Sequence, residues 1–122
     1  MVGRVTQRII MIATPPAIFL VCSALDMRYG INNLSLYLQK NGHVPNNGTA
    51  YLFSNARRNR LKVLVWDGNG IWLFQRRLHQ GFFVWPKVAA THVEMSQEQW
   101  KWLISGVDWQ RLNPPTTTPC VL

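Results

Sequence analysis

The chain has 122 residues, which suits one domain with one modest hydrophobic core. Hydrophobic residues make up 48% of it, so a wholly disordered chain is excluded. Lys and Arg number 13 against 5 Asp and Glu, a formal net charge of +8. This balance excludes an acidic solvating tail or a neutral packing module and favours an anionic partner, either nucleic acid or an anionic membrane surface.

The N-terminus carries an apolar run, Ile9 to Leu25, preceded by Arg4 and Arg8 in the manner of a signal peptide. Pro15-Pro16 interrupts the run, which is also short for a membrane span. The alternative is an extended strand over Ala17 to Val21 that leads into the first helix. Two cysteines are too few for a disulfide framework. We therefore expect a cytoplasmic protein with no membrane partner.

The first half of the chain predicts a helix followed by a strand. Asp26 is a favourable N-cap, and Asn41-Gly42 is typical of the C-terminal end of a helix. A loop is predicted at Pro45 to Gly48 and an aromatic-rich strand at Thr49 to Ser54. The apolar face of the helix recurs at steps of four, three and four residues: Met27, Ile31, Leu34 and Leu38.

A hairpin is the clearest prediction in the chain. Leu61 to Trp66 and Ile71 to Arg77 are strands joined by the turn Asp67-Gly68-Asn69-Gly70, whose residues supply the positive φ angles of tight hairpins. A polar, basic connection over Asn55 to Arg60 precedes it.

Further strands are predicted after the hairpin. Leu78 to Gly81 indicates a second turn, Phe82 to Trp85 a third strand ended by Pro86, and Ala90 to Glu94 a weaker strand.

The last helix is marked at both ends. Ser96 is its N-cap, Gln99 completes a capping box, and Gly106 ends it. Met95 and Trp100 are placed for a hydrophobic staple, and the apolar stripe consists of Trp100, Leu103 and Ile104.

The order of these elements predicts an α+β fold. We expect an antiparallel β-meander of about four to five strands, with one helix in the N-terminal half and a C-terminal helix packed on it. We expect residues 11–112 to form the single domain and residues 113–122 to form a flexible tail rich in Pro and Thr.

Basic residues gather in the predicted meander, where only Asp67 opposes them: Arg57, Arg58, Arg60, Lys62, Arg76, Arg77 and Lys87. If Trp66 pairs with Ile71, Arg60 lies opposite Arg77, and like charges so placed destabilise a hairpin. A polyanion would relieve the repulsion, since guanidinium groups bind phosphate in bidentate fashion. We interpret the cluster as a DNA-binding site; the alternative is a solvated basic rim that only aids solubility.

Aromatic residues interleave with these bases. Trp66, Phe83, Trp85 and Trp109 are candidates for base stacking or partner contact. Trp72 and Phe74 share one face of a half-buried strand, so we expect them in the core.

The residues do not predict an enzyme. Asp26, Asp67 and Glu98 are explained as cap, turn and first-turn helix charge, which leaves too few carboxylates for a two-metal site. The three histidines lack metal-binding spacing, and neither a phosphate-binding glycine loop nor a nucleophile elbow is present. We expect no catalytic residues, no metal, no cofactor and no small-molecule substrate.

Five motifs between about Met11 and Trp109 resemble the TnpB-type accessory proteins of the insertion sequence sixty-six family, the second-frame products of these bacterial elements. They are Asp26-Met27-Arg28-x-Gly30, Phe53-x-Asn55-x-Arg57-Arg58, Lys62-x-Leu64-x-Trp66-Asp67-x-x-Gly70, Arg77-Leu78-x-x-Gly81-x-Phe83-x-Trp85-Pro86 and Gly106-x-Asp108-Trp109.

The resemblance implies an accessory factor of transposition that is not itself the transposase. It assigns no catalytic residues. Because Met11-Ile12 resembles the usual start of such proteins, it also implies that residues 1–10 are an N-terminal extension. Its implied partners are DNA, the element-encoded transposase or the other small element-encoded protein. A protein-interaction adaptor that docks on the transposase through Phe82 to Trp85 and Trp109 is the alternative to a DNA-binding protein.

Overall fold

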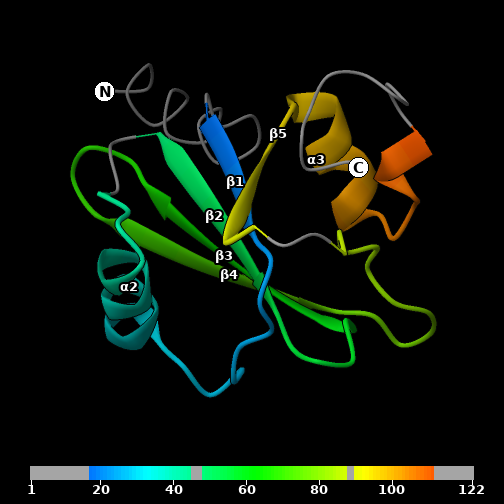
Figure 1. Cartoon of the computed structure of the whole chain (residues 1–122), viewed down its shortest axis with the longest axis horizontal. Helices are drawn as coiled ribbons and strands as arrows, with labels where there is room; N and C mark the ends of the chain where they lie inside the picture. Colours follow the sequence, from blue (N-terminus) through cyan, green and yellow to red (C-terminus); the bar gives the residue numbers. More distant parts are fainter. Residues whose placement is uncertain (1–16, 45–47, 88–89, 112–122) are drawn as a thin grey trace, which may run out of the picture.

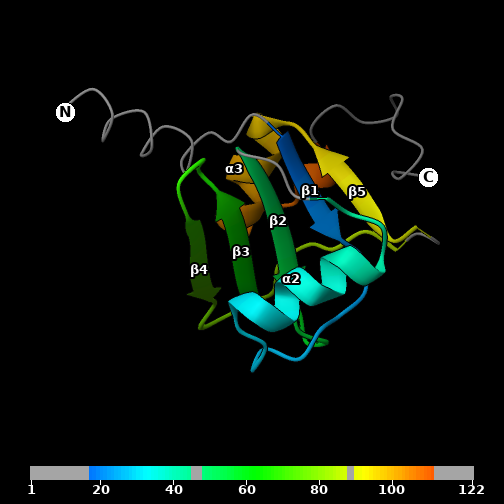
Figure 2. The same ribbon diagram turned by 90° about the vertical axis from the view of Figure 1, so that its left-hand side faces the viewer.

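The computed structural model describes residues 17–44, 48–87 and 90–111 of the chain. In chain order the elements are β1 (Ala17–Val21), α2 (Ile31–Lys40), β2 (Thr49–Ser54), β3 (Arg60–Trp66), β4 (Ile71–Arg77), β5 (His92–Met95), α3 (Gln97–Ile104) and the 3-10 helix η1 (Trp109–Arg111). One sheet separates the two α-helices (Figure 1). In Figure 2, α2 lies in front of the sheet and α3 behind it. The expectations for residues 1–10, Pro15-Pro16, 45–47 and 113–122 fall outside the described residues.

The strands lie in the order β4-β3-β2-β1-β5. β2, β3 and β4 are antiparallel neighbours and form the predicted meander. β1 runs parallel to β2, because α2 carries the chain back to the end of the sheet at which β1 begins. β5 pairs antiparallel with β1. The predicted α+β class is confirmed, with a mixed sheet in which the meander covers β2 to β4.

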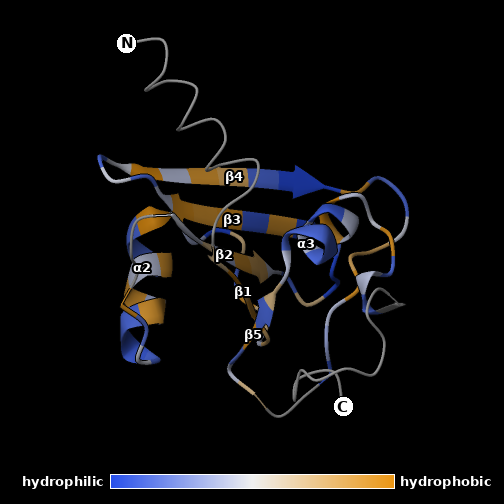
Figure 3. Cartoon of the chain, turned by 90° about the horizontal axis from the view of Figure 1, so that it is seen from above, coloured by the Kyte–Doolittle hydropathy of each residue, from blue (hydrophilic) through white to orange (hydrophobic). Residues whose placement is uncertain are grey.

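Each face of the sheet has its own hydrophobic core. Under α2, Leu34 and Leu38 pack with side chains of β1, β2 and β3, among them Phe53 and Leu64. Under α3, Trp100 and Leu103 pack with the side chains that alternate to the opposite face of the same strands. β2 is buried along its whole length, whereas β4 is largely exposed. Figure 3 shows that β4 is apolar where it begins and hydrophilic where it ends.

The first helix begins later than its sequence suggested. Asp26 is not the N-cap: its carboxylate accepts hydrogen bonds from the backbone N–H of Arg28 at 2.8 Å and from the Arg28 guanidinium. The backbone N–H of Tyr29 donates to the Asp26 carbonyl at 3.1 Å, which closes a turn. The helix therefore starts after Gly30, its N-cap. The predicted end is confirmed, and Gly42 adopts a φ of 81° that favours glycine.

The central hairpin is confirmed in both position and register. Trp66 pairs with Ile71, Arg60 with Arg77 and Lys62 with Gln75. The Asp67 carboxylate accepts from the backbone N–H groups of Asn69 and Gly70, which fixes the turn.

The predicted strand over Phe82 to Trp85 is wrong. The segment pairs with none of the described strands, although Phe83 and Trp85 alternate into the core under α3 as strand residues would. The backbone N–H of Phe83 donates to the Arg58 carbonyl at 2.6 Å, and the Trp85 indole N–H donates to the Val21 carbonyl at 2.9 Å. Alternating burial was thus a correct signal of packing and a misleading signal of strand pairing. The weaker strand predicted at Ala90 to Glu94 is β5, two residues later at its start.

The C-terminal helix forms as predicted. The Ser96 hydroxyl accepts from the Gln99 N–H at 3.1 Å, and the Gln99 side chain accepts from the Ser96 N–H at 2.9 Å. Trp100 and Leu103 are buried, and Gly106 follows with a φ of 77°. No helix among the described residues is long and apolar enough to cross a bilayer.

Truncation of Leu103 tests whether α3 is a structural element. Because Leu103 is fully buried, Leu103→Ala is expected to lower the free energy of unfolding by about 2–5 kcal/mol in urea denaturation. The matched control is Lys101→Ala on the exposed side of α3, expected within about 0.5 kcal/mol of the unmodified protein. Equal stabilities for the two variants would contradict the core assignment.

Candidate nucleic-acid interface

The end of the β3–β4 hairpin farthest from its turn is cationic. Arg60 and Arg77 are exposed and directly opposite each other, on the sheet face that α2 covers further along. The next pair on this face is Lys62 with Gln75. The predicted juxtaposition of like charges is therefore present.

Lys62, the neighbour of Arg60 on this face, is buried. Its side chain is only 5% exposed, and its ammonium donates a hydrogen bond of 2.7 Å to the Tyr29 carbonyl. This bond ties the turn before α2 to the sheet and satisfies a charge that would otherwise be costly to bury. Lys62 thus adds positive charge to this end of the hairpin, while its ammonium is held by the Tyr29 carbonyl.

A hollow of about 380 Å³ lies at this cationic end of the hairpin. Its lining residues include one glutamine and four basic residues, and none of them is acidic. Arg76 borders the hollow, but its side chain alternates with Leu61 to the opposite face of the sheet. The residues are Met27, Arg60, Leu61, Lys62, Gln75, Arg76 and Arg77. A site with this lining suits an anion with several oxygen atoms, such as a phosphate group.

The acidic residue nearest in sequence to the hollow, Asp26, is already paired with a positive charge. The hydrogen bonds from Arg28 hold the pKa of the Asp26 carboxyl at about 2. Asp26 therefore stays ionised and paired with Arg28, at 2.7 Å, and this pair adds no net charge to the surface.

The loop before β3 is built by Asn55. Its side-chain oxygen accepts from the backbone N–H groups of Asn59 and Arg60, and its amide donates to the Asn59 side chain at 2.7 Å. Arg57 is exposed on this loop. Arg58 occupies the left-handed region with a φ of 60°, and its backbone N–H donates to the Asn55 carbonyl.

Arg58 turns inward, unlike Arg57. Its guanidinium donates to the Ser54 hydroxyl at 2.6 Å and to the Cys22 carbonyl at 3.3 Å, and it lies 5.2 Å from the centre of the Trp85 ring. Burial lowers the pKa of this guanidinium from its ordinary value. Arg58 is therefore engaged in holding the loop to the sheet.

The aromatic candidates lie mostly inside. Phe83, Trp85 and Trp109 are buried, so their rings are not offered to a base or a partner. The Trp109 indole N–H donates to the Val84 carbonyl at 2.7 Å, so this polar group is satisfied within the fold. Trp66 is half-buried against Tyr51, edge to face at 6.0 Å. Lys87 is exposed but does not line the hollow.

Trp72, expected in the core, is 42% exposed, which corrects that prediction. Its indole N–H donates to the Asp67 carboxylate at 2.6 Å, and its ring stacks on Phe74 with 5.8 Å between centroids. Phe74 itself is half-buried against the core under α3. Trp72 is exposed because β4 lies at the edge of the described sheet, and the alternation of its side chains alone does not distinguish an edge strand from a central one.

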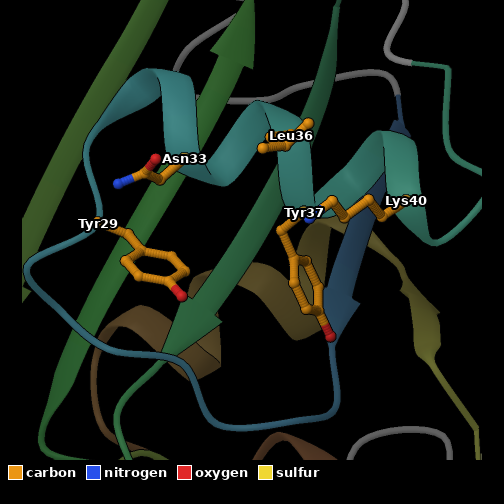
Figure 4. Close-up of a pocket in the computed structure, with 5 residues that line it drawn as sticks. All are labelled: Tyr29, Asn33, Leu36, Tyr37 and Lys40. Carbon is orange, nitrogen blue, oxygen red and sulfur yellow. The ribbon is translucent and has the colours of Figure 1, made fainter.

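Two other clusters offer less chemistry. A hollow of about 180 Å³ lies along α2, and its lining side chains, drawn in Figure 4, include no carboxylate, thiol or histidine. They are Tyr29, Asn33, Leu36, Tyr37 and Lys40. His43 and His92 lie with ring centroids 4.3 Å apart, and burial, followed by His92, lowers the pKa of His43. Within the described ranges no three His, Cys, Asp or Glu residues come together as metal ligands.

Residues 16–114 match the family described as IS66 Orf2-like protein, TnpB_IS66. Two similar proteins come from Sinorhizobium fredii (strain NBRC 101917 / NGR234). The uncharacterized protein y4hO is 37% identical over 86 residues, which cover 70% of this chain and 75% of the relative. The uncharacterized protein y4jC is 33% identical over 113 residues, 92% of this chain and 90% of the relative. No solved structure matches the chain.

The family match spans nearly the whole described sheet, both helices and the cationic hollow. It agrees with the resemblance carried by the five sequence motifs. The chain therefore belongs to the IS66 Orf2-like family and is an insertion-sequence accessory protein.

Proposed function

We propose that this accessory protein acts in the cytoplasm by binding the DNA phosphate backbone, without catalysing a reaction. The observation that carries the proposal is the hollow at the end of the β3–β4 hairpin, whose lining includes four basic residues and no acidic residue. The net charge of +8 supports it, because a strongly basic small domain attracts a polyanion over a long range.

The opposed pair Arg60 and Arg77 gives this hollow its affinity for phosphate. Two guanidinium groups at directly opposite positions repel each other in the free protein. A phosphate between them removes that repulsion and accepts charge-assisted hydrogen bonds from both. Such binding depends steeply on salt, because each neutralised phosphate releases condensed counterions.

The absence of acid–base groups from the lining favours binding over catalysis. Arginine and lysine side chains hold an anion, but strand cleavage also needs a group that activates a nucleophile. The carboxylate nearest in sequence, Asp26, is occupied by Arg28. We therefore infer that strand transfer belongs to another element-encoded protein.

A protein-interaction adaptor is the alternative function, and one exposed side chain favours it. Phe82 is 65% exposed beside the segment whose neighbouring aromatics are buried. Under this alternative, Phe82→Ser would abolish co-purification with the transposase or the other small element-encoded protein. The same variant would leave DNA binding unchanged.

The double variant Arg60→Ala with Arg77→Ala tests DNA binding. It is expected to weaken duplex binding and to reduce the slope of log K against log salt by about two, one for each lost phosphate contact. Fluorescence anisotropy over a salt series, with an element-end duplex and a scrambled duplex, measures both quantities. Equal affinities for the two duplexes indicate backbone binding, and unequal affinities indicate base readout.

The matched control is Lys40→Ala with Lys101→Ala, which removes two exposed positive charges far from the hairpin in sequence. If both double variants lower the slope equally, net charge alone accounts for binding. An unchanged slope in folded Arg60→Ala with Arg77→Ala would sink the proposed site.

Arg58 is expected to stabilise the fold, whereas Arg57 is not. Arg58→Ala loses two hydrogen bonds of a charged group and should lower the free energy of unfolding by about 1–3 kcal/mol. Arg58→Lys keeps the charge but not the guanidinium fork, so it should not restore stability. Arg57→Ala serves as the control, with unchanged thermal stability. Full stability in Arg58→Lys would show that charge, not the fork, is what matters.

A further inference from the structure

β4 forms one edge of the sheet. Within the described part of the chain it pairs with β3 alone, and its other side carries no strand. It is seven residues long, and most of them are exposed. Edge strands of this length offer a row of backbone donors and acceptors to a strand from another chain.

The hydrogen bonds at both ends of the hairpin determine which residues face the open edge. The Asp67 N–H donates to the Gly70 carbonyl at 3.1 Å, and the Leu78 N–H donates to the Asn59 carbonyl at 2.9 Å. Bonded and non-bonded positions alternate along an antiparallel pair. Counting inward from either end therefore shows that the backbone N–H and C=O groups of residues 72, 74 and 76 point toward β3. Those of Ile71, Leu73, Gln75 and Arg77 point toward the open edge.

β4 is divided into an apolar half, Ile71 to Phe74, and a polar, cationic half, Gln75 to Arg77 (Figure 3). We propose that the open edge pairs with β4 of a second copy of this chain, antiparallel about a two-fold axis at Phe74. This register satisfies the outward backbone groups, since Ile71 then bonds Arg77, and Leu73 bonds Gln75, of the second copy. It also lays each apolar half against a cationic half, whereas a parallel pairing would place arginine beside arginine.

Charge complementarity supports the second copy as the occupant. In this register Arg76 of one copy faces Trp72 of the other at a non-hydrogen-bonded position, where side chains approach most closely. Trp72 is exposed and stacked flat on Phe74, and its indole N–H donates a hydrogen bond of 2.6 Å to the Asp67 carboxylate. An incoming guanidinium thus meets an aromatic face and a carboxylate together.

The contact is one strand wide, with roughly eight backbone hydrogen bonds, so the dimer is weak and depends on concentration. It joins two five-stranded sheets into one continuous sheet.

Cysteine cross-linking tests the register, in a background with Cys22→Ala and Cys120→Ser. Phe74→Cys lies opposite itself on the axis and should form a disulfide dimer under mild oxidation. Trp72→Cys alone and Arg76→Cys alone should stay monomeric, whereas a mixture of the two should cross-link. Failure of Phe74→Cys to cross-link, or equal cross-linking of all three single variants, would overturn the proposal.

Sedimentation of the full chain provides an independent test that does not depend on replacing an aromatic residue. Gln75→Pro removes an outward N–H and leaves every bond to β3 in place. Because the symmetry doubles the loss, self-association should weaken roughly tenfold or more. Gln75→Ala, which keeps the N–H, should associate like the unmodified chain. A monomer at millimolar concentration, or a dimer insensitive to Gln75→Pro, would refute pairing through β4.

Discussion

The complete burial of β2, beside a parallel neighbour β1 that is mostly buried, is the constraint on which the rest of the structure depends. These strands form a parallel pair at the centre of the sheet, and β2 exposes no side chain on either face. A parallel pair needs a covering layer on each side. α2, with ten residues, covers one face, and α3, with eight, covers the other. These short helices leave β4 with little cover, so most of its side chains are exposed.

The same constraint divides the basic residues into two groups. Arg58 and Lys62 come from the loop and strand next to the buried centre, and both donate to backbone carbonyls from distant parts of the chain. They hold the turn before α2 and the loop before β3 against the sheet. Arg60 and Arg77 lie further out and remain exposed. A count of positive charges in the sequence therefore overstates the exposed cationic surface, because Arg58 and Lys62 hold parts of the fold together.

Local signals predicted the parts of the fold that local contacts determine. The turn from Asp67 to Gly70 closes through bonds among its own residues, and Ser96 and Gln99 cap α3 reciprocally. The N-cap prediction for Asp26 was wrong because its carboxylate can either cap a helix or bond to Arg28, and the sequence does not show which of the two forms. The remaining outcomes depend on the arrangement of parts that are distant in the sequence. Phe83 and Trp85 alternate toward the core without pairing to a described strand, and Trp72 is exposed because β4 lies at the edge of the described sheet.

The two proposals for β4 use different faces of the same strand, because successive side chains point to opposite sides. Arg77 shares its face with Arg60, whereas Trp72 and Phe74 share the other face with Arg76. Arg76 borders the hollow in the single chain, but its side chain belongs to the second face. In the two-fold pair, the Arg77 positions of the two copies are six residues apart along the strand direction, roughly 20 Å at the usual rise. Two hollows at that spacing on one continuous sheet would bind one duplex together, so that weak self-association and weak phosphate binding strengthen each other without a new contact.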